Sequence, residues 1–175
     1  MTDRALAKPY EPTTGERTAL DAHRDRRKRR SPAPRVKVSD NTLSVDHADE
    51  VVGETLLMEA IGTADQDFLD GFLVQLANVV TIGPNITAHE VNFMLSIVKD
   101  IEPRDQVEAM LAAQMAATHN AIMTFGRRLN HRVDSPQQDS AERAFNKLAR
   151  TFAAQVETLK RYRGGEQTMR VENVR

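Results

Sequence analysis

The feature that most constrains the fold is a run of eighteen residues without a charged side chain, from Ala109 to Gly126. Six of these residues are alanine, and the surrounding segment, residues 104–130, contains no proline and no glycine before Gly126. Its bulky residues recur at steps of three and four, which places them on one side of a helix. They are Val107, Leu111, Met115, Ile122, Phe125 and Leu129. A helix without charge all round is covered on more than one face, so the run predicts the central helix of a helical protein.

The composition excludes several kinds of site and environment. The chain has no cysteine, so it can form neither disulfides nor thiolate metal sites. Polar residues in the uncharged run, Gln114, Thr118, His119, Asn120 and Thr124, would be costly in lipid, which favours a buried bundle helix over a membrane span. The first twenty residues contain no apolar run typical of a secretory signal, so we expect a cytoplasmic protein without a membrane partner.

The net charge of −1 conceals a strong segregation of charge along the chain. Residues 1–39 carry eleven Lys or Arg and five Asp or Glu, a net charge of +6. Residues 40–101 carry one Lys and eleven acidic residues, a net charge of −10, and residues 102–163 return to +3. Such asymmetry bears on partners and docking more than on fold.

Residues 1–45 are predicted to be a disordered basic arm. Up to residue 38 they contain four prolines and almost no periodic apolar residues. Between Ala22 and Lys37 the net charge is +7, enough to neutralise several phosphates of a nucleic acid. The candidate nucleic-acid-binding residues are Arg24, Arg26, Arg27, Lys28, Arg29, Arg30, Arg35 and Lys37. Two other interpretations stay open, a solvated tail and an arm that lies on the protein's own acidic helices.

Residues 46–101 are predicted to form short acidic helices at the start of a helical domain that spans residues 46–163. Asp46 is placed to cap a first helix that ends at Gly62. Residues 63–66 (TADQ) and 87–90 (TAHE) have the form of capping boxes, each before a segment with helical periodicity. Residues 83–85 (GPN) supply the loop between those two helices.

Residues 102–163 are predicted to form a long antiparallel helical hairpin, followed by a flexible tail at 164–175. Pro103 suits the first turn of the central helix, and residues 135–138 (SPQQ) give a strong start signal for the last helix. A short polar loop between two long helices favours an antiparallel pair. The last helix follows a coiled-coil heptad, and its candidate oligomer-interface residues are Phe145, Leu148, Phe152, Leu159 and Tyr162. A second basic cluster, Arg127, Arg128, Arg132, Arg143 and Lys147, would meet at the tip of the hairpin.

Two parts of the helical segment resemble a known group of proteins. They are residues 139–155 (DSAERAFNKLARTFAAQ) with 159–165 (LKRYRGG), and residues 101–115 (IEPRDQVEAMLAAQM). Both stretches resemble an uncharacterised group of short, all-helical alphaproteobacterial proteins. The resemblance covers roughly residues 50–170 and implies a helical protein, but it implies no activity.

No catalytic or metal-binding motif stands out in the sequence. Five histidines occur, but no pair has the four-residue spacing of a zinc helix, and no glycine-rich phosphate loop is present. We therefore expect no enzymatic activity, no catalytic residues, no metal site and no cofactor. The fold that the sequence predicts is all-α, with a disordered basic N-terminal arm, short acidic helices and a long antiparallel hairpin.

The function predicted from these features is that of a non-enzymatic accessory or adaptor protein, a homo-oligomer that contacts nucleic acid non-specifically through its basic arm. A protein-only adaptor, whose acidic helical face captures a basic protein partner, is the first alternative. A phage-packaging component similar to a terminase small subunit is the second, because such proteins combine a nucleic-acid-binding end with a helical oligomerisation hairpin. Salt-dependent DNA binding would separate the adaptor that binds nucleic acid from the protein-only alternative.

Overall fold

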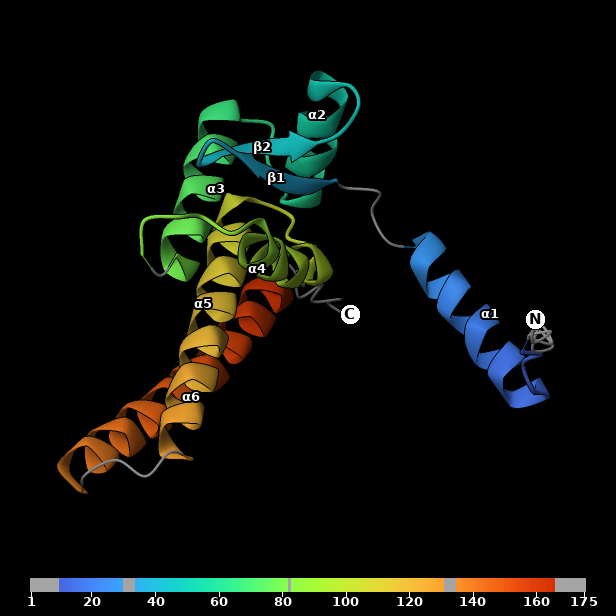
Figure 1. Ribbon diagram of the computed structural model, residues 1–175. Helices are drawn as coiled ribbons and strands as arrows, with labels where there is room; N and C mark the ends of the chain where they lie inside the picture. The colour runs from blue at the N-terminus through green and yellow to red at the C-terminus, as the bar shows by residue number, and fades with distance from the viewer. Residues whose placement is uncertain (1–9, 30–33, 82, 131–134, 166–175) are drawn as a thin grey trace, which may run out of the picture. The chain divides into compact units, whose positions relative to one another are not determined.

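The structure, a computed structural model, describes residues 10–29, 34–81, 83–130 and 135–165, without the side chains of residues 135 and 136. The chain divides into two units, residues 1–31 and 32–175. Six helices and one antiparallel β-hairpin occur in the described residues (Figure 1). Their bounds are α1 (Thr14–Arg29), β1 (Arg35–Ser39), β2 (Thr42–Asp46), α2 (Glu50–Ala60), α3 (Gln66–Val80), α4 (Ala88–Ile101), α5 (Gln106–Leu129) and α6 (Ser135–Gly164). The fold is therefore mostly helical, as predicted, but the β-hairpin means that it is not all-α.

The first unit contains helix α1, where the sequence predicted a disordered arm. A reciprocal cap stabilises its start, because the backbone N–H of Thr13 donates to Oε2 of Glu16 at 2.7 Å. The backbone N–H of Glu16 donates in turn to Oγ1 of Thr13 at 3.4 Å. This helix could not be predicted from the sequence, because no apolar stripe follows the capping box and none of the helix residues is buried.

In the second unit, β1 and β2 form a β-hairpin inside the segment that was also predicted to be disordered. Asp40 and Asn41 occupy its turn with φ of +50° and +59°, a conformation that two-residue turns require and that these residue types tolerate. Val36 pairs with Val45, and both side chains are buried. The core of this unit therefore includes residues well before the predicted start at Asp46.

Side-chain amides bind the hairpin to the neighbouring helical segments. The backbone N–H of Val36 donates to Oδ1 of Asn92 on α4 at 2.9 Å, and Nδ2 of Asn92 donates to the carbonyl of Val36 at 2.7 Å. Asn41 in the turn accepts the backbone N–H of Ile86 at 2.8 Å, just before α4. The two bonds to Asn92 fix β1 against α4. They use the backbone N–H and carbonyl of Val36, the groups with which a third strand would pair.

Helix caps in this unit follow the predicted pattern with two shifts. Helix α2 is capped by Asp49 instead of Asp46, because Asp46 is the last residue of β2. Helix α3 is capped by Asp65 instead of Thr63. Thr87 occupies the predicted N-cap position of α4. The carboxylates of Asp49 and Asp65 accept backbone N–H groups, so part of the acidic charge of this segment serves to start helices.

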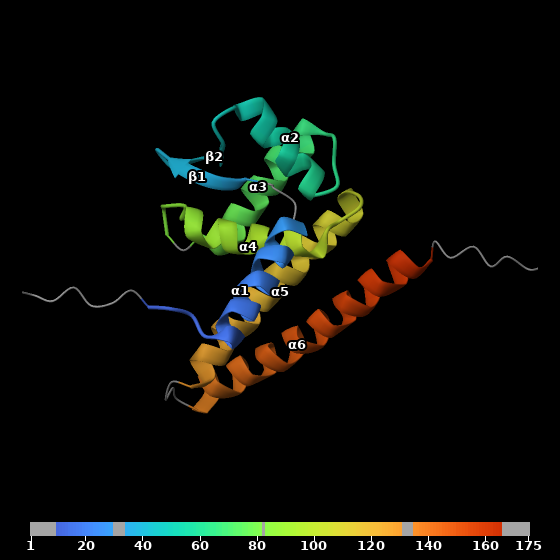
Figure 2. The same cartoon turned by 90° about the vertical axis from the view of Figure 1, so that its right-hand side faces the viewer.

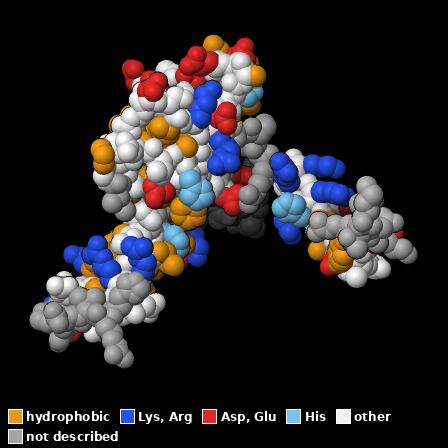
Figure 3. Space-filling model, in the orientation of Figure 1, with side chains coloured by type: hydrophobic (Ala, Val, Ile, Leu, Met, Phe, Trp, Pro, Cys, Tyr) orange, Lys and Arg blue, Asp and Glu red, His pale blue; other side chains and the backbone are white. Residues whose placement is uncertain are grey.

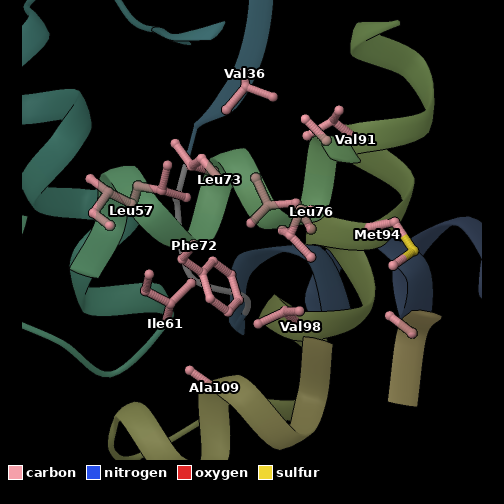
Figure 4. Packing of buried hydrophobic residues seen from close by; sticks show 14 of the residues in the cluster. Val36, Leu57, Ile61, Phe72, Leu73, Leu76, Val91, Met94, Val98 and Ala109 are labelled. Atoms are coloured by element: carbon pink, nitrogen blue, oxygen red, sulfur yellow. The ribbon is translucent and has the colours of Figure 1, made fainter. Parts of the chain in front are cut away.

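The core of the second unit is built around α3. Figure 4 shows Phe72, Leu73 and Leu76 of α3 in the middle of the cluster, between side chains from the β-hairpin and the other helices. The surrounding side chains include Val36 of β1, Leu57 of α2, Ile61 after it, Val91, Met94 and Val98 of α4, and Ala109 of α5. Residues Ala109, Ala112 and Ala116 of α5 are completely buried, so the alanine side of the uncharged run lies in the core, whereas Val107 on the bulky side of the helix is 49% exposed.

Helices α5 and α6 extend side by side beyond this core, with their joined ends pointing away from it (Figures 1 and 2). They form the predicted antiparallel hairpin. From Ala117 to Gly126 every residue of α5 is half-buried except Met123, which is exposed. Helix α6 covers one side of this part of α5, and His89 and Phe93 of α4 line a pocket with Asn120 and Met123 on another. Within the described residues, no helix is both long enough and apolar enough to cross a membrane.

Candidate nucleic-acid interface

The basic end of α1 is the first candidate for contact with nucleic acid. Its last turn consists of Arg26, Arg27, Lys28 and Arg29, all exposed. Arg24, one turn earlier, pairs with Asp21 at 3.1 Å in an exposed ion pair that contributes little to stability. Positive charge at the C-terminal end of a helix is favoured by the helix dipole, but four consecutive basic residues far exceed what that effect requires.

The remaining candidates from the basic arm lie elsewhere. Arg35 and Lys37 are on β1, in the second unit, with both side chains exposed. Their neighbours Val36 and Val38 alternate with them and point inward, so β1 carries charge on one face and core residues on the other. Arg30 lies outside the described residues. Five of the eight predicted binding residues are therefore on α1 and two on β1.

Lys99 of α4 adds a partly buried cation close to β1. Its Nζ donates to the carbonyl of Pro34 at 3.2 Å. Burial lowers the pKa of the Lys99 ammonium, and the charge of Arg35 lowers this pKa further. The residue supports the start of β1 and makes this part of the unit more positive.

The tip of the α5–α6 hairpin carries the second basic cluster. Arg127 and Arg128 end α5, while Arg143 and Lys147 lie in the first half of α6, and all four are exposed. The guanidinium of Arg128 lies 5.1 Å from the centroid of the Phe125 ring, a cation–π geometry. Figure 3 shows Lys and Arg side chains gathered over this end of the hairpin, whereas Asp and Glu gather over α2 and α3. The fifth predicted member, Arg132, lies outside the described residues.

The predicted oligomer seam contacts α5 of the same chain. A Cβ added at Gly126 would lie 3.4 Å from Cε2 of Phe145, and the ring of Phe152 lies 6.3 Å from that of His119. Leu148 and Leu159 are half-buried, and the hydroxyl of Tyr162 donates to Oδ2 of Asp105 at 3.0 Å. The heptad thus serves the hairpin itself, and contact between copies through these residues remains a prediction.

An ion pair that was not predicted from the sequence holds the base of the hairpin. Arg163, near the end of α6, donates from Nε and Nη2 to the carboxylate of Glu108, at distances between 2.8 and 3.2 Å. Its Nη2 also donates to the carbonyls of Ile101 and Glu102 at the end of α4. Glu108 is only 1% exposed, and its remaining partner is the backbone N–H of Arg104 at 3.0 Å.

This ion pair closes the corner between α4 and α5, where Pro103 lies before the helix and not in its first turn as predicted. The hydrogen bonds from Arg163 are the main reason why the pKa of the Glu108 carboxyl is lowered despite its burial. The only signal in the sequence is a single acidic residue near the start of one helix and an arginine near the end of the next. That pattern is too common to predict a pair.

Among the described residues, no three His, Asp or Glu side chains are grouped so that they could hold a metal ion. No protein-family model matches the chain, and neither does any curated protein or any solved structure. The candidate interface must therefore be judged on the charges and exposure of its own residues.

Proposed function

We propose that this protein is a non-enzymatic, oligomeric adaptor that contacts nucleic acid through the basic end of α1. The observation that carries the proposal is the last turn of that helix, four consecutive basic residues on a helix with no buried residue. A helix that buries nothing gains no stability from packing, so its charged surface is free to meet a polyanion.

The chemistry of α1 favours sequence-independent binding. Phosphates attract Lys and Arg through counterion release, which needs no fixed base contacts. The only aromatic residue described near the helix, Tyr10, donates to Glu16 at 2.6 Å, at the end of the helix away from the basic turn. Base stacking therefore has no aromatic platform in the described part of the basic end. If three to five phosphates are neutralised, the slope of log affinity against log salt should be roughly −3 to −5 on duplex DNA.

The protein-only adaptor has one observation in its favour. Acidic side chains gather over α2 and α3 (Figure 3), and Glu50, Asp67 and Asp70 are exposed there. A basic partner could dock on this surface without any nucleic acid. Capture that survives nuclease treatment and needs these three residues would favour this alternative.

The proposal is tested by measuring fluorescence anisotropy of a labelled 20-base-pair DNA duplex with the full chain at several salt concentrations. The informative variant replaces Arg26, Arg27, Lys28 and Arg29 by Ala, and Ala keeps the helix propensity high. The matched control replaces Arg127, Arg128, Arg143 and Lys147 by Ala, which removes the same charge from the hairpin tip.

We expect the α1 variant to lose affinity by at least tenfold at low salt. Its slope of log affinity against log salt should be closer to zero by about 3 or more. We expect the control to bind within about twofold of the unmodified chain. Equal loss in both variants would mean that binding depends on the combined positive charge of α1 and the hairpin tip, and not on α1 alone. A loss in the control alone would move the interface to the hairpin tip, and no binding by the unmodified chain would remove nucleic acid from the proposal.

A further inference from the structure

One side of α5 faces away from both the α3–α4 core and the main contacts with α6, and its residues are exposed or half-buried. The side toward α6 is identified by Glu108, His119 and Gly126, which contact Arg163, Phe152 and Phe145. The side toward α3 and α4 is identified by the buried residues Ala109, Ala112 and Ala116. The third side carries a stripe of uncharged residues, which recur at alternating steps of four and three along the helix. We call it the open stripe; it consists of Val107, Leu111, Gln114, Thr118, Ala121 and Phe125.

An apolar groove runs beside the open stripe. It has a volume of about 160 Å³ and is lined by Phe72, Leu76 and Val79 of α3 and by Met110 and Ala113 of α5, among others. Val79 is 50% exposed and Met110 is 44% exposed, so the rim of the groove is apolar and the other described elements of the second unit do not cover it. A cavity of about 150 Å³ is enough to hold a benzene ring, so this groove is large enough for one aromatic side chain.

The area of this face matches what a dimer needs. Helix α5 has 24 residues and is therefore about 36 Å long. Together with α3 at a usual interaxial distance of 8–10 Å, it offers a face roughly 20 Å wide, hence on the order of 700 Å². A standard specific interface buries about 800 Å² on each partner. The open stripe and groove are thus of the size that a second chain would cover.

Charge decides the direction in which a second copy would lie. The basic tip of the hairpin is at one end of the open stripe, with Arg128 as its next residue. At the other end lies the start of α3, because Nε2 of Gln106 donates to Oγ1 of Thr63 at 3.0 Å. That start carries Asp67 and Asp70, both exposed. A parallel pair would place like charges together, whereas an antiparallel pair brings each basic tip to the end of the partner at which α3 starts with its acidic residues.

We propose that a second copy of this chain covers the open stripe, with the two α5 helices antiparallel around a two-fold axis between Ala117 and Thr118. This position is the middle of α5 and places Phe125 of each copy opposite Met110 of the other, at the apolar groove. Such a contact is isologous and closes at two copies. The inference rests on the oligomer in the proposed function and specifies how its copies pair, through residues different from the heptad of α6.

The absence of cysteine from the chain makes this geometry testable by disulfide cross-linking of the full-length protein. In the proposed dimer, Gln114 of one copy lies opposite Ala121 of the other. Two copies of either position are about 10 Å apart along the helix axis. That exceeds the Cα distance of 4.4–6.8 Å that a disulfide allows. The variants are therefore Gln114→Cys and Ala121→Cys, oxidised separately and as an equimolar mixture, with Thr151→Cys on the exposed side of α6 as the control.

The expected result is a cross-linked dimer in the mixture and none with either variant alone or with the control. Circular dichroism of each variant verifies that the helices are intact, and light scattering of the unmodified chain gives its mass. Cross-links within each single variant would overturn the proposal in favour of a parallel pair. A dimer by scattering without the mixed cross-link would overturn it and leave the oligomer standing. A monomer of 19.6 kDa at tens of micromolar would overturn both.

Discussion

Replacing Arg163 by Met should destabilise the second unit strongly, because it leaves the Glu108 carboxylate buried without its main partner. Arg163 donates five hydrogen bonds, three to Glu108 and two to carbonyls at the end of α4. Glu108 is 1% exposed, and the backbone N–H and the charge of Arg104 would be left to stabilise its carboxylate. Breaking a fully buried pair from one side usually costs about 3–5 kcal/mol; because the Arg163 side chain is 30% exposed, we expect a loss near the lower end of that range.

The pH dependence of this loss provides a second test. The folded-state pKa of Glu108 is lowered from its ordinary value of 4.5, chiefly by the hydrogen bonds from Arg163. The pair therefore stabilises the fold fully above that value, and its contribution is lost as pH falls below 4.5 through the folded pKa. In Arg163→Met this lowering is removed while the burial that raises the pKa of Glu108 stays, so protonation relieves the buried charge at a higher pH than in the unmodified chain. The difference between the variant and the unmodified chain should thus be largest at pH 7 and smaller by at least half at pH 4.

The assay is urea unfolding followed by circular dichroism at both pH values. Lys160→Met is the matched control, since Lys160 and Glu157 form an ion pair on the same helix with side chains 69% and 62% exposed. Such a surface pair contributes well under about 1 kcal/mol. Adding Glu108→Gln to Arg163→Met should recover at least half of the loss, because the buried charge is gone. A cost below about 1 kcal/mol, or a cost that is the same at pH 7 and pH 4, would refute this account of the pair.

Three other changes test the fold. Gly62 has φ of +69°, and a Cβ there would lie 2.4 Å from the carbonyl oxygen of Pro103, so Gly62→Ala should lower the melting temperature. Gly71→Ala on an open face of α3 should instead raise stability by about 1 kcal/mol; equal shifts in thermal melts would contradict both. Asn92→Ala leaves the backbone of Val36 without its two bonds and should cost roughly 2–3 kcal/mol in urea unfolding. Phe152→Ala should cost about 2 kcal/mol, less than the 3–5 expected for a fully buried ring, because Phe152 is half-buried.

The helices could be predicted from the periodicity of apolar residues in the sequence. The start of α4 after Thr87, the loop before it and the antiparallel α5–α6 pair all follow from capping residues and from apolar residues at three- and four-residue steps. The errors at Asp46 and Thr63 are small, because each true cap is an aspartate within three residues of the predicted one. Local side-chain-to-backbone bonds decide these positions, and several nearby residues can supply them.

The β-hairpin could not be recognised in the same way. Val36, Val38, Leu43 and Val45 alternate correctly, but the basic residues around them and the prolines before them favoured a disordered segment. The strands gain their stability from α4, through Asn92 and through burial of Val36, and that contact spans more than fifty residues of the chain. A two-stranded hairpin is marginal by itself, so the information that orders it lies outside it.

The positions of the candidate basic residues in the fold could not be predicted from the sequence either. The sequence places eight basic residues in one continuous segment, and the structure divides the described ones between α1 and the exposed face of β1. What the sequence could not indicate is that Arg35 and Lys37 are held by a strand whose alternate residues are in the core. Truncation after residue 38, the boundary that composition suggests, would remove Val36 together with the charges, whereas truncation after residue 31 would spare it.

The ion pair at the base of the hairpin links the fold to the proposed assembly. Arg163 joins the end of α6 to the last carbonyls of α4 and to the first turn of α5, so three helices meet at one guanidinium. This contact fixes the direction in which the hairpin leaves the core, and with it the spacing between the basic tip and the acidic start of α3. If two copies pair around Ala117 and Thr118, each tip reaches the partner's aspartates only while that spacing holds. The Arg163→Met variant should then lose the mixed Gln114–Ala121 cross-link at pH 7 even under conditions in which its helices remain folded. A full yield of that cross-link would show that the pairing depends on α5 alone.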